Sequence, residues 1–193
     1  MTESRLVLAS TSRYRRELLE RLGLPFDCIA PGVDETPRDD ESPQALVERL
    51  ARAKAGAVAN ATPRACVIGS DQLAEFDGRI LGKPGTPERA VAQLASMSGR
   101  RVTFLTALCV MRDENEIGLH VDRTVVRFRD LSNAEIERYV DAERPYDCAG
   151  SFKSEGRGIA LFEAIETNDP TALVGLPLIA TARLLRDAGF ALP

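Results

Sequence analysis

The sequence predicts an α/β fold with a central, largely buried mixed sheet, and three observations support this. Short apolar runs that suit buried strands alternate with longer segments in which apolar residues recur at helical spacing. Hydroxyl residues followed by proline or by a glutamate three positions on mark the starts of several helices. The 193 residues, 44% hydrophobic and 28% charged, have ordinary globular composition, and no linker or repeat divides them. We therefore expect one domain over residues 1–193.

The first half of the chain predicts two strand–helix pairs. Residues 5–9 form a short apolar strand, and a helix follows over about 13–22, with Gly23 at its left-handed stop. A serine–proline pair begins a second helix over 42–60. Residues 65–69 predict another short strand, which ends before a polar triplet.

The second half continues the alternation. Asp77-Gly78 favours a tight hairpin turn, and Ser132-Asn-Ala-Glu135 is a capping box. In chain order, the expected elements are a hairpin over 73–81, a helix over 86–97, strands over 102–111 and 119–128, a helix over 132–142, a loop over 150–158, a mixed segment over 159–165 and a final helix over 176–188. Strands and helices in this order imply a mixed sheet covered by helices.

Composition argues against several functional classes. A net charge of −4 disfavours broad nucleic-acid binding but leaves room for a phosphorylated small substrate. No segment approaches the roughly 18 apolar residues of a membrane span, so no membrane partner is expected. The only histidine, His120, has no obvious partner, and we assign it no catalytic role. The four cysteines are widely spaced, which predicts reduced, mostly buried thiols and a cytoplasmic protein. They are Cys28, Cys66, Cys109 and Cys148.

The turn that begins the first helix suits an anion. Three cations occupy the opening turn, where the helix dipole disfavours them: Arg13, Arg15 and Arg16. A phosphate bound at the amide-rich N-terminus, near the hydroxyl of Ser10, would remove this conflict. A solvated basic patch balanced by Glu17 and Glu20 is the alternative.

A lysine occupies an unexpected place in the second helix. Lys54 lies at the centre of the apolar stripe of helix 42–60, so it either extends to solvent or meets an anion. Just upstream, Asp34 and Glu35 share a tight loop that could hold a divalent cation through oxygen ligands. Solvated loop acids are a commoner reason for such a pair.

Two further segments carry polar residues at candidate site positions. Ser70-Asp71-Gln72 follows a predicted strand, and ligands bind beyond the carboxyl ends of strands in open α/β sheets. Lys83 lies across the hairpin, which could return it towards Asp71. Three glycines surround Lys153 and Glu155 in the 150–158 loop, which is neither a Walker A loop nor a dinucleotide fingerprint. The alternative for Asp71 is an ordinary aspartate in a turn. The alternative for residues 150–158 is a flexible loop without a role in the site.

Together these segments supply the parts for hydrolysing a phosphoanhydride: cations for phosphate charge, and carboxylates for a metal ion and for water. Their motifs, in this order, resemble the Maf family of nucleoside triphosphate pyrophosphatases over essentially the whole chain. The residues that carry the resemblance are LASTSRYRR (8–16), VDETPR (33–38), GSDQ (69–72), LGKP (81–84) and CAGSFKSEG (148–156).

The resemblance implies a two-lobed α/β/α fold with an inter-lobe cleft, related to the inosine-triphosphate pyrophosphatases and often a homodimer. It implies hydrolysis between the α and β phosphates with a divalent metal cation, Mg²⁺ or Mn²⁺. By motif position, Asp71 matches the proposed general base, and polar cleft positions match Glu35, Lys54 and Lys83. The phosphate-binding turn matches Ser10, Arg15 and Arg16. We expect Glu35 and Asp71 to hold the metal ion, and the residues leave open whether Asp71 acts as ligand, as base or as both.

Three positions bear on the substrate. One branch of the family, which acts on dTTP and UTP, typically carries Arg, Thr and Gln where this chain has Tyr14, Gln72 and Glu155. These residues resemble the branch that hydrolyses 7-methyl-GTP. N7-methylation makes guanine cationic, so an aromatic ring could stack on it while Glu155 accepts its N1 and N2 hydrogens. The chain departs from the family at Arg13, where proline is usual, and Tyr14 stands where tryptophan is frequent.

The sequence therefore predicts hydrolysis of 7-methyl-GTP to 7-methyl-GMP and pyrophosphate. One alternative is the same reaction on dTTP, UTP or another modified nucleotide, which Tyr14 and Glu155 disfavour. A nucleotide-binding regulator of cell division with little turnover is another, and it would not need the combination of Asp71, Lys54 and Lys83.

Overall fold

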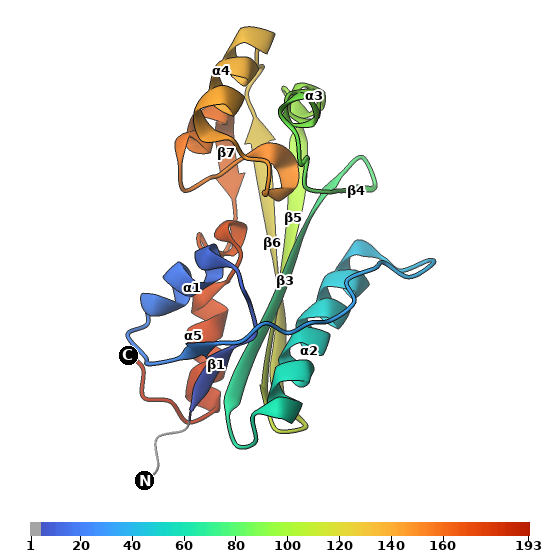
Figure 1. The fold of residues 1–193 in the computed structure, drawn as a ribbon. Helices are drawn as coiled ribbons and strands as arrows, with labels where there is room; N and C mark the ends of the chain where they lie inside the picture. Colours follow the sequence, from blue (N-terminus) through green and yellow to red (C-terminus); the bar gives the residue numbers. More distant parts are fainter. Residues whose placement is uncertain (1–4) are drawn as a thin grey trace. The chain divides into compact units, whose positions relative to one another are not determined.

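The computed structural model describes residues 5–193 and confirms the alternating α/β order (Figure 1). The strands are β1 (Leu6–Leu8), β2 (Asp27–Cys28), β3 (Cys66–Phe76), β4 (Arg79–Leu81), β5 (Arg101–Arg112), β6 (Asn115–Phe128) and β7 (Phe162–Glu166). The helices are α1 (Arg13–Glu20), α2 (Pro43–Ala61), α3 (Pro87–Met97), α4 (Asn133–Glu143) and α5 (Leu178–Asp187), with short 3-10 helices η1 (Ala149–Ser151), η2 (Arg157–Leu161) and η3 (Ala172–Val174).

The sheet is mixed, as predicted. Its strand order is β2-β1-β3-β5-β6-β7, with β4 beside β3. β1 pairs in parallel with β2 and β3, whereas β3 with β4 and β6 with β7 are antiparallel. The described residues group into two compact units: unit 1 holds residues 5–72, 106–122 and 169–193, and unit 2 holds 73–105 and 123–168. The inter-lobe cleft that the resemblance implies stays a prediction.

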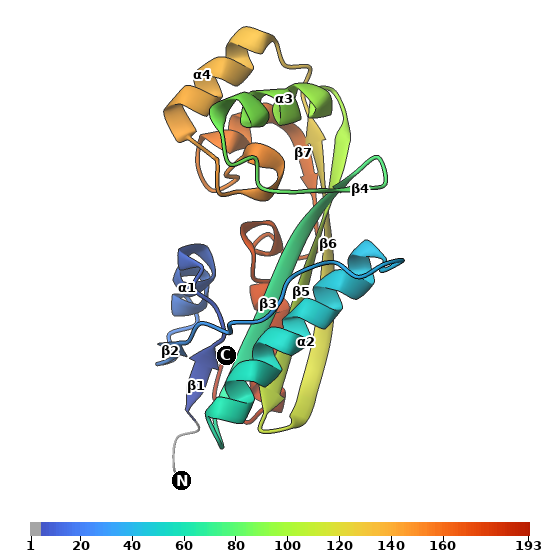
Figure 2. The same cartoon turned by 45° about the vertical axis from the view of Figure 1, so that its right-hand side comes forward.

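Unit 1 is built in layers. Helix α2 lies on one face of its strands, and α1 and α5 lie on the other (Figures 1 and 2). Successive strand side chains point to opposite faces, so β1 can send Leu6 and Leu8 towards α1 and α5 and Val7 towards α2. All three are buried, and Leu6 and Leu8 belong to a core cluster with Leu18 and Leu19 of α1. Burial of this apolar surface is the main force holding the layers together.

Unit 2 has an aromatic core. Phe152 contacts Phe104, Phe128 and Phe162 edge-to-face, with ring centroids 5.3, 5.7 and 4.8 Å away. Such edge-to-face pairs contribute beyond the area they bury. Phe152 belongs to the glycine-rich segment predicted as a loop, so this segment is anchored in the core of unit 2 by one aromatic side chain.

Local sequence signals proved accurate at helix starts and at the hairpin. Ser42, Thr86 and Ser132 are N-caps whose hydroxyls accept backbone N–H bonds, and Ser132 forms the predicted capping box with Glu135. At the β3–β4 hairpin, Asp77-Gly78 has φ values of 51° and 72°, as a primed turn requires.

The predicted end of the strand over 65–69 was wrong. β3 continues to Phe76, so Ser70-Asp71-Gln72 lies inside a strand rather than after it. The physical reason lies in the neighbouring strand. β1 ends at Leu8, opposite Ile68, so the polar triplet is beyond the carboxyl end of β1 although β3 itself runs on.

The four cysteines are free, but only two are buried. Cys66 and Cys109 are buried, Cys28 is exposed and Cys148 is intermediate, so the expectation of mostly buried thiols was half right. Burial raises the pKa of Cys66 to about 11 and that of Cys109 to about 12, which keeps both thiols protonated and unreactive at neutral pH. Within residues 5–193, none of the helices has the length and apolarity needed to span a bilayer.

Candidate active site

The centre of the site is a buried ion pair between α2 and β3. The Lys54 Nζ lies 2.7 Å from Asp71 Oδ1, and the two residues are only 5% and 8% exposed. The sequence left two possibilities for this lysine, extension to solvent or contact with an anion. The structure shows contact with a buried carboxylate. Removing both charges from water is costly, so each depends on the other for stability.

Gly69 explains how the helix and the strand come close enough for this pair. A Cβ at Gly69 would lie 2.3 Å from the Ala51 carbonyl oxygen and 2.5 Å from the Ala55 backbone nitrogen, both in α2. Any side chain at this position would therefore push the helix away from β3. The glycine precedes Asp71 by two residues, so the closest approach of the two backbones lies next to the ion pair.

Two more charges complete the cluster. Lys54 Nζ also lies 2.8 Å from Glu35 Oε1, whose side chain is 58% exposed, so the lysine is shared between a buried and a solvated carboxylate. Burial of the Arg15 guanidinium lowers its pKa from its ordinary value, and the charges of Asp71 and Glu35 act in the opposite direction. The cluster thus contains two cations and two carboxylates. It brings together the predicted residues of three separate motifs.

A backbone carbonyl that sequence reasoning missed anchors this cluster. The Gly175 carbonyl oxygen accepts from Arg15 Nε at 2.9 Å and from Ser70 Oγ at 3.1 Å. It thereby links α1 and β3 to the segment before α5. Arg15 is held in a fixed orientation, and its terminal guanidinium nitrogens have no hydrogen bond to the described residues.

Asp169 shapes the segment that presents Gly175. Its carboxylate accepts from Thr171 N at 2.9 Å, Thr171 Oγ1 at 2.6 Å and Ile179 N at 2.7 Å. It therefore closes the turn and satisfies an amide at the start of α5. The Asp-Pro-Thr sequence at 169–171 is a turn signal that could have indicated this ordered segment.

Gln72 is engaged inside unit 1. Its Nε2 donates to Thr106 Oγ1 at 3.0 Å and to the carbonyl oxygens of Ala172 and Leu173 at 2.9 and 3.0 Å. An amide nitrogen has two hydrogens, so these three acceptors occupy it fully. Gln72 therefore braces η3, directly before Gly175, and any contact with a nucleotide would have to use its carbonyl oxygen.

Replacing Gln72 with leucine should lower the free energy of unfolding by about 1–3 kcal/mol, because the Leu173 carbonyl oxygen loses its donor, while that of Ala172 keeps Thr106 Oγ1 and Gly175 N. Urea unfolding followed by circular dichroism measures this. Gln44→Leu is the matched control, since Gln44 bonds Glu48 on the exposed side of α2, and its effect should stay within about 0.5 kcal/mol. Equal effects of the two changes would show that the brace is energetically unimportant.

The remaining predicted residues of α1 and the turn before it are placed as follows. Ser10 is buried, and its Oγ accepts the N–H of Ser12 at 3.1 Å. Arg16 is exposed and pairs with Glu20 at 3.2 Å, one turn further along α1. The Arg13 guanidinium lies over the Tyr14 ring, 5.0 Å from its centroid, so this ring already holds a cation. The phosphate and base contacts of these residues stay predictions.

Lys83 and Glu155 belong to unit 2. Both are exposed, and Lys83 forms no ion pair with any described residue. Ser154 Oγ donates to Glu155 Oε2 at 3.4 Å. The neighbouring Lys153 is structural: its backbone N–H donates to Tyr139 Oη at 3.0 Å and its Nζ to the Glu143 carbonyl oxygen at 3.1 Å.

The chemistry of the donor set fits a divalent metal. Residues 5–193 contain no cluster of three or more acidic, histidine or cysteine ligands. Mg²⁺, however, typically takes one or two carboxylates and completes its shell with water and substrate phosphates. Asp71 Oδ1 and Glu35 Oε1 lie 2.7 and 2.8 Å from Lys54 Nζ, so the two carboxylates are close to each other. Their second oxygens, Asp71 Oδ2 and Glu35 Oε2, are not engaged by that lysine. A metal ion held by these two carboxylates stays a prediction.

The model of the Maf-like protein family matches residues 5–188, and the chain belongs to this family.

The chain is also similar to curated proteins along nearly its whole length. It is 61% identical to the 7-methyl-GTP pyrophosphatase of Xanthomonas oryzae pv. oryzae (strain MAFF 311018) over 98% of this chain and 99% of the relative. It is 59% identical to the 7-methyl-GTP pyrophosphatase of Burkholderia lata, over 97% of this chain and 91% of the relative. The solved Ham1 protein of Staphylococcus aureus aligns with 80% of this chain and 90% of its own, at 18% identity and a TM-score of 0.48.

Proposed function

We propose that this chain is a hydrolase that cleaves 7-methyl-GTP to 7-methyl-GMP and pyrophosphate. The observation that carries the proposal is the buried Lys54–Asp71 pair with Glu35 and Arg15 beside it, in a chain 61% identical over nearly its full length to a protein named 7-methyl-GTP pyrophosphatase. Binding alone would not need a buried carboxylate, whose desolvation is costly.

Asp71 is the residue that activates water. The Lys54 ammonium engages Oδ1, which leaves Oδ2 to orient a water molecule and accept its proton. The water oxygen forms a bond to the α-phosphorus while the bond from that phosphorus to the bridging oxygen breaks. Pyrophosphate leaves with the electron pair of that bond, and one proton passes to Asp71.

Cations offset the charge that grows on the leaving pyrophosphate. Arg15 is oriented for this by its bond to Gly175 and by burial, and the proposal assigns the same role to Lys54, Lys83 and Arg16. Fixed donors cost no reorganisation during the reaction. Ser10 completes the turn at the N-terminus of α1, where backbone amides favour an anion.

The proposal includes a divalent cation, Mg²⁺ or Mn²⁺, held by Glu35, with Asp71 as its second ligand in the alternative in which another group accepts the proton from water. When bound, it would polarise the phosphate oxygens and neutralise part of their charge. The proposal also includes a cytoplasmic location and a homodimer, as the sequence suggested.

A pyrophosphate-release assay over a nucleotide panel tests the proposed reaction. We expect release from 7-methyl-GTP to exceed that from GTP, dTTP and UTP, and chelation with EDTA to abolish it until Mg²⁺ or Mn²⁺ is restored. Faster turnover of dTTP or UTP would instead support the pyrimidine alternative. Nucleotide binding without pyrophosphate release would support a regulator.

The base preference has its own test at Glu155. Glu155→Gln keeps the size of the side chain but replaces one acceptor with a donor, so it should lower kcat/KM for 7-methyl-GTP by about 10-fold or more relative to dTTP. The preference is the ratio of the two kcat/KM values. The matched control is Glu137→Gln, the same change at an exposed glutamate of α4, and it should leave the ratio unchanged. An unchanged ratio in Glu155→Gln would remove this residue from base recognition.

A further inference from the structure

Gln93 of α3 bonds to two segments of unit 2 that carry predicted site residues. Its Nε2 donates to the Gly82 carbonyl oxygen at 3.2 Å, directly before Lys83. Its Oε1 accepts from the hydroxyl of Ser151, which lies in the glycine-rich segment that carries Glu155. Helix α3 also packs against η1, which contains Ser151. One side-chain amide therefore joins the turn that holds Lys83 to the segment that holds Glu155.

Ser151 is held in an uncommon backbone conformation. It is fully buried, and its φ of 59° lies in the left-handed region, as does that of Gly150 at 77°. This region is unfavourable for a residue with a Cβ, so the contacts around Ser151 must hold it there. Two of them are its backbone N–H to the Cys148 carbonyl oxygen at 3.1 Å and its hydroxyl to Gln93. Residues held in this way cluster at functional sites, which directs attention to the Gln93–Ser151 bond.

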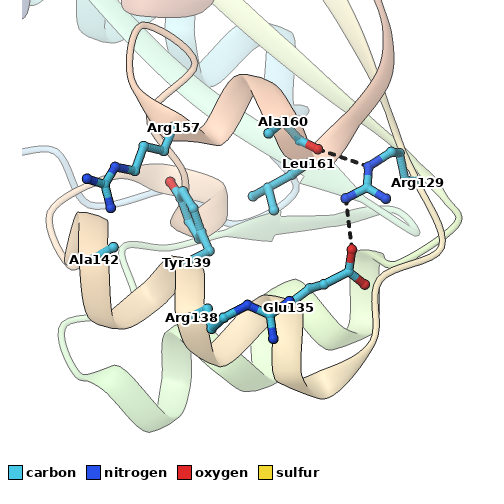
Figure 3. Close-up of a pocket in the computed structure, with 8 residues that line it drawn as sticks. All are labelled: Arg129, Glu135, Arg138, Tyr139, Ala142, Arg157, Ala160 and Leu161. Carbon is cyan, nitrogen blue, oxygen red and sulfur yellow. Dashed lines mark hydrogen bonds and ion pairs between the residues drawn. The ribbon is translucent and has the colours of Figure 1, made fainter.

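The glycine-rich segment is also fixed beyond Ser151. Phe152 lies in the aromatic core of unit 2, and the Lys153 backbone N–H donates to Tyr139 Oη at 3.0 Å. Tyr139 is buried, and its hydroxyl points away from α4 towards the segment that contains Arg157 (Figure 3). With these anchors the segment has little freedom to follow Gln93. The buried Ser151 hydroxyl therefore orients the amide of Gln93, rather than the reverse.

The turn that holds Lys83 is fixed by one bond on each side. Lys83 itself is exposed. After it, the Gly85 N–H donates to the Tyr146 carbonyl oxygen at 3.0 Å, and before it the Gly82 carbonyl oxygen accepts from Gln93. A side-chain amide is planar, so the hydroxyl that engages its oxygen also determines where its nitrogen points. The direction of the bond to Gly82 thus depends on the glycine-rich segment.

From these contacts we propose that Gln93 is a positioning residue for Lys83, which it holds in a fixed relation to the segment that carries Glu155. The inference rests on the proposed function, in which Lys83 offsets charge on the leaving pyrophosphate and Glu155 contacts the base. A cation stabilises a transition state best when it is already in place, because no reorganisation is then needed during the reaction. Gln93 acts through the backbone next to Lys83 and not through contact with the substrate.

Kinetics of Gln93→Met test this role, because methionine keeps the side-chain length but cannot donate to Gly82 and accepts only weakly from Ser151. We expect kcat for 7-methyl-GTP to fall about 10-fold while KM changes by less than about 3-fold. In the Lys83→Met background, where the lysine is already absent, the same change should lower kcat by less than about 2-fold. Arg89→Met is the matched control: Arg89 is exposed one turn earlier on α3, and its loss should leave kcat and KM unchanged.

Backbone-amide NMR tests the linkage independently of the reaction. In the ¹⁵N-labelled full chain, Ser151→Ala removes the hydroxyl that orients Gln93, and we expect the Lys83 amide signal to shift. In the Gln93→Met background, Ser151→Ala should move the Lys83 amide no further than Arg89→Met does.

Three results would overturn the proposal. They are equal fold losses from Gln93→Met with and without Lys83, full activity in Lys83→Met, and a Lys83 amide shift that is absent or equal in the two backgrounds. Failure of the wild-type chain to release pyrophosphate from 7-methyl-GTP would instead reject the proposed function. The NMR comparison would then still decide whether Gln93 links the two segments.

Discussion

Asp71→Asn should reduce kcat for 7-methyl-GTP by at least about a hundredfold, because an amide cannot take a proton from water. The fold should persist: asparagine has nearly the same shape, its oxygen can still accept from Lys54, and Lys54 retains Glu35 at 2.8 Å. Single-turnover pyrophosphate release measures the chemical step, and circular dichroism checks the fold.

The control for this change is Asp34→Asn in the loop that also holds Glu35. The Asp34 carboxylate bonds Thr36 N and Thr36 Oγ1 at 2.9 and 2.6 Å, and these bonds lower its pKa. It has no contact with Lys54, so its loss should change kcat by only a few-fold. Substantial turnover in Asp71→Asn would reject the assignment of Asp71 as the base.

Lys54→Met should affect both stability and activity. Methionine fills a similar volume but leaves the Asp71 carboxylate buried without its cation, and breaking a buried pair in this way typically costs about 3–5 kcal/mol. The solvated Glu35 side chain contributes little to that loss. Urea unfolding at pH 7 measures the change in stability, and the nucleotide assay measures the loss of turnover.

Lys83→Met is the matched control, because Lys83 is exposed and pairs with no described residue. It should change stability by less than about 0.5 kcal/mol, while its turnover still falls if Lys83 neutralises the leaving group. The double variant Lys54→Met/Asp71→Leu should recover part of the lost stability without recovering activity. Equal stability of Lys54→Met and wild type would show that the pair is not a stabilising element.

The predictable part of the structure was local. The hydroxyls of Ser42, Thr86 and Ser132 each accept the backbone N–H of the residue three positions further on. The Asp77-Gly78 turn likewise depends only on its own two residues. Lys54 was also recognisable from the helix alone, because a charge in an apolar stripe needs a partner. The identity of that partner depended on which strand lies beneath the helix, and periodicity in one segment does not contain that information.

The unpredicted part depends on contacts between distant segments. The end of β3 was misjudged because polar residues were taken to end a strand, whereas neighbouring strands keep them extended. Gly175 and Asp169 were missed since their importance arises from Arg15 and Ile179, 160 and 10 residues away. Gln72 was predicted from the resemblance as a specificity residue, and the structure adds that its amide nitrogen braces η3.

Gly69 has a consequence for how this protein can be altered. The missing side chain lets the backbones of α2 and β3 approach closely beside the Lys54–Asp71 pair, and a larger residue there would push them apart. Engineering for new nucleotides should therefore treat residue 69 as invariant and vary positions such as Tyr14 and Glu155. If Tyr14 and Glu155 recognise the base as proposed, substrate preference can diverge at these positions while the buried Lys54–Asp71 pair is kept.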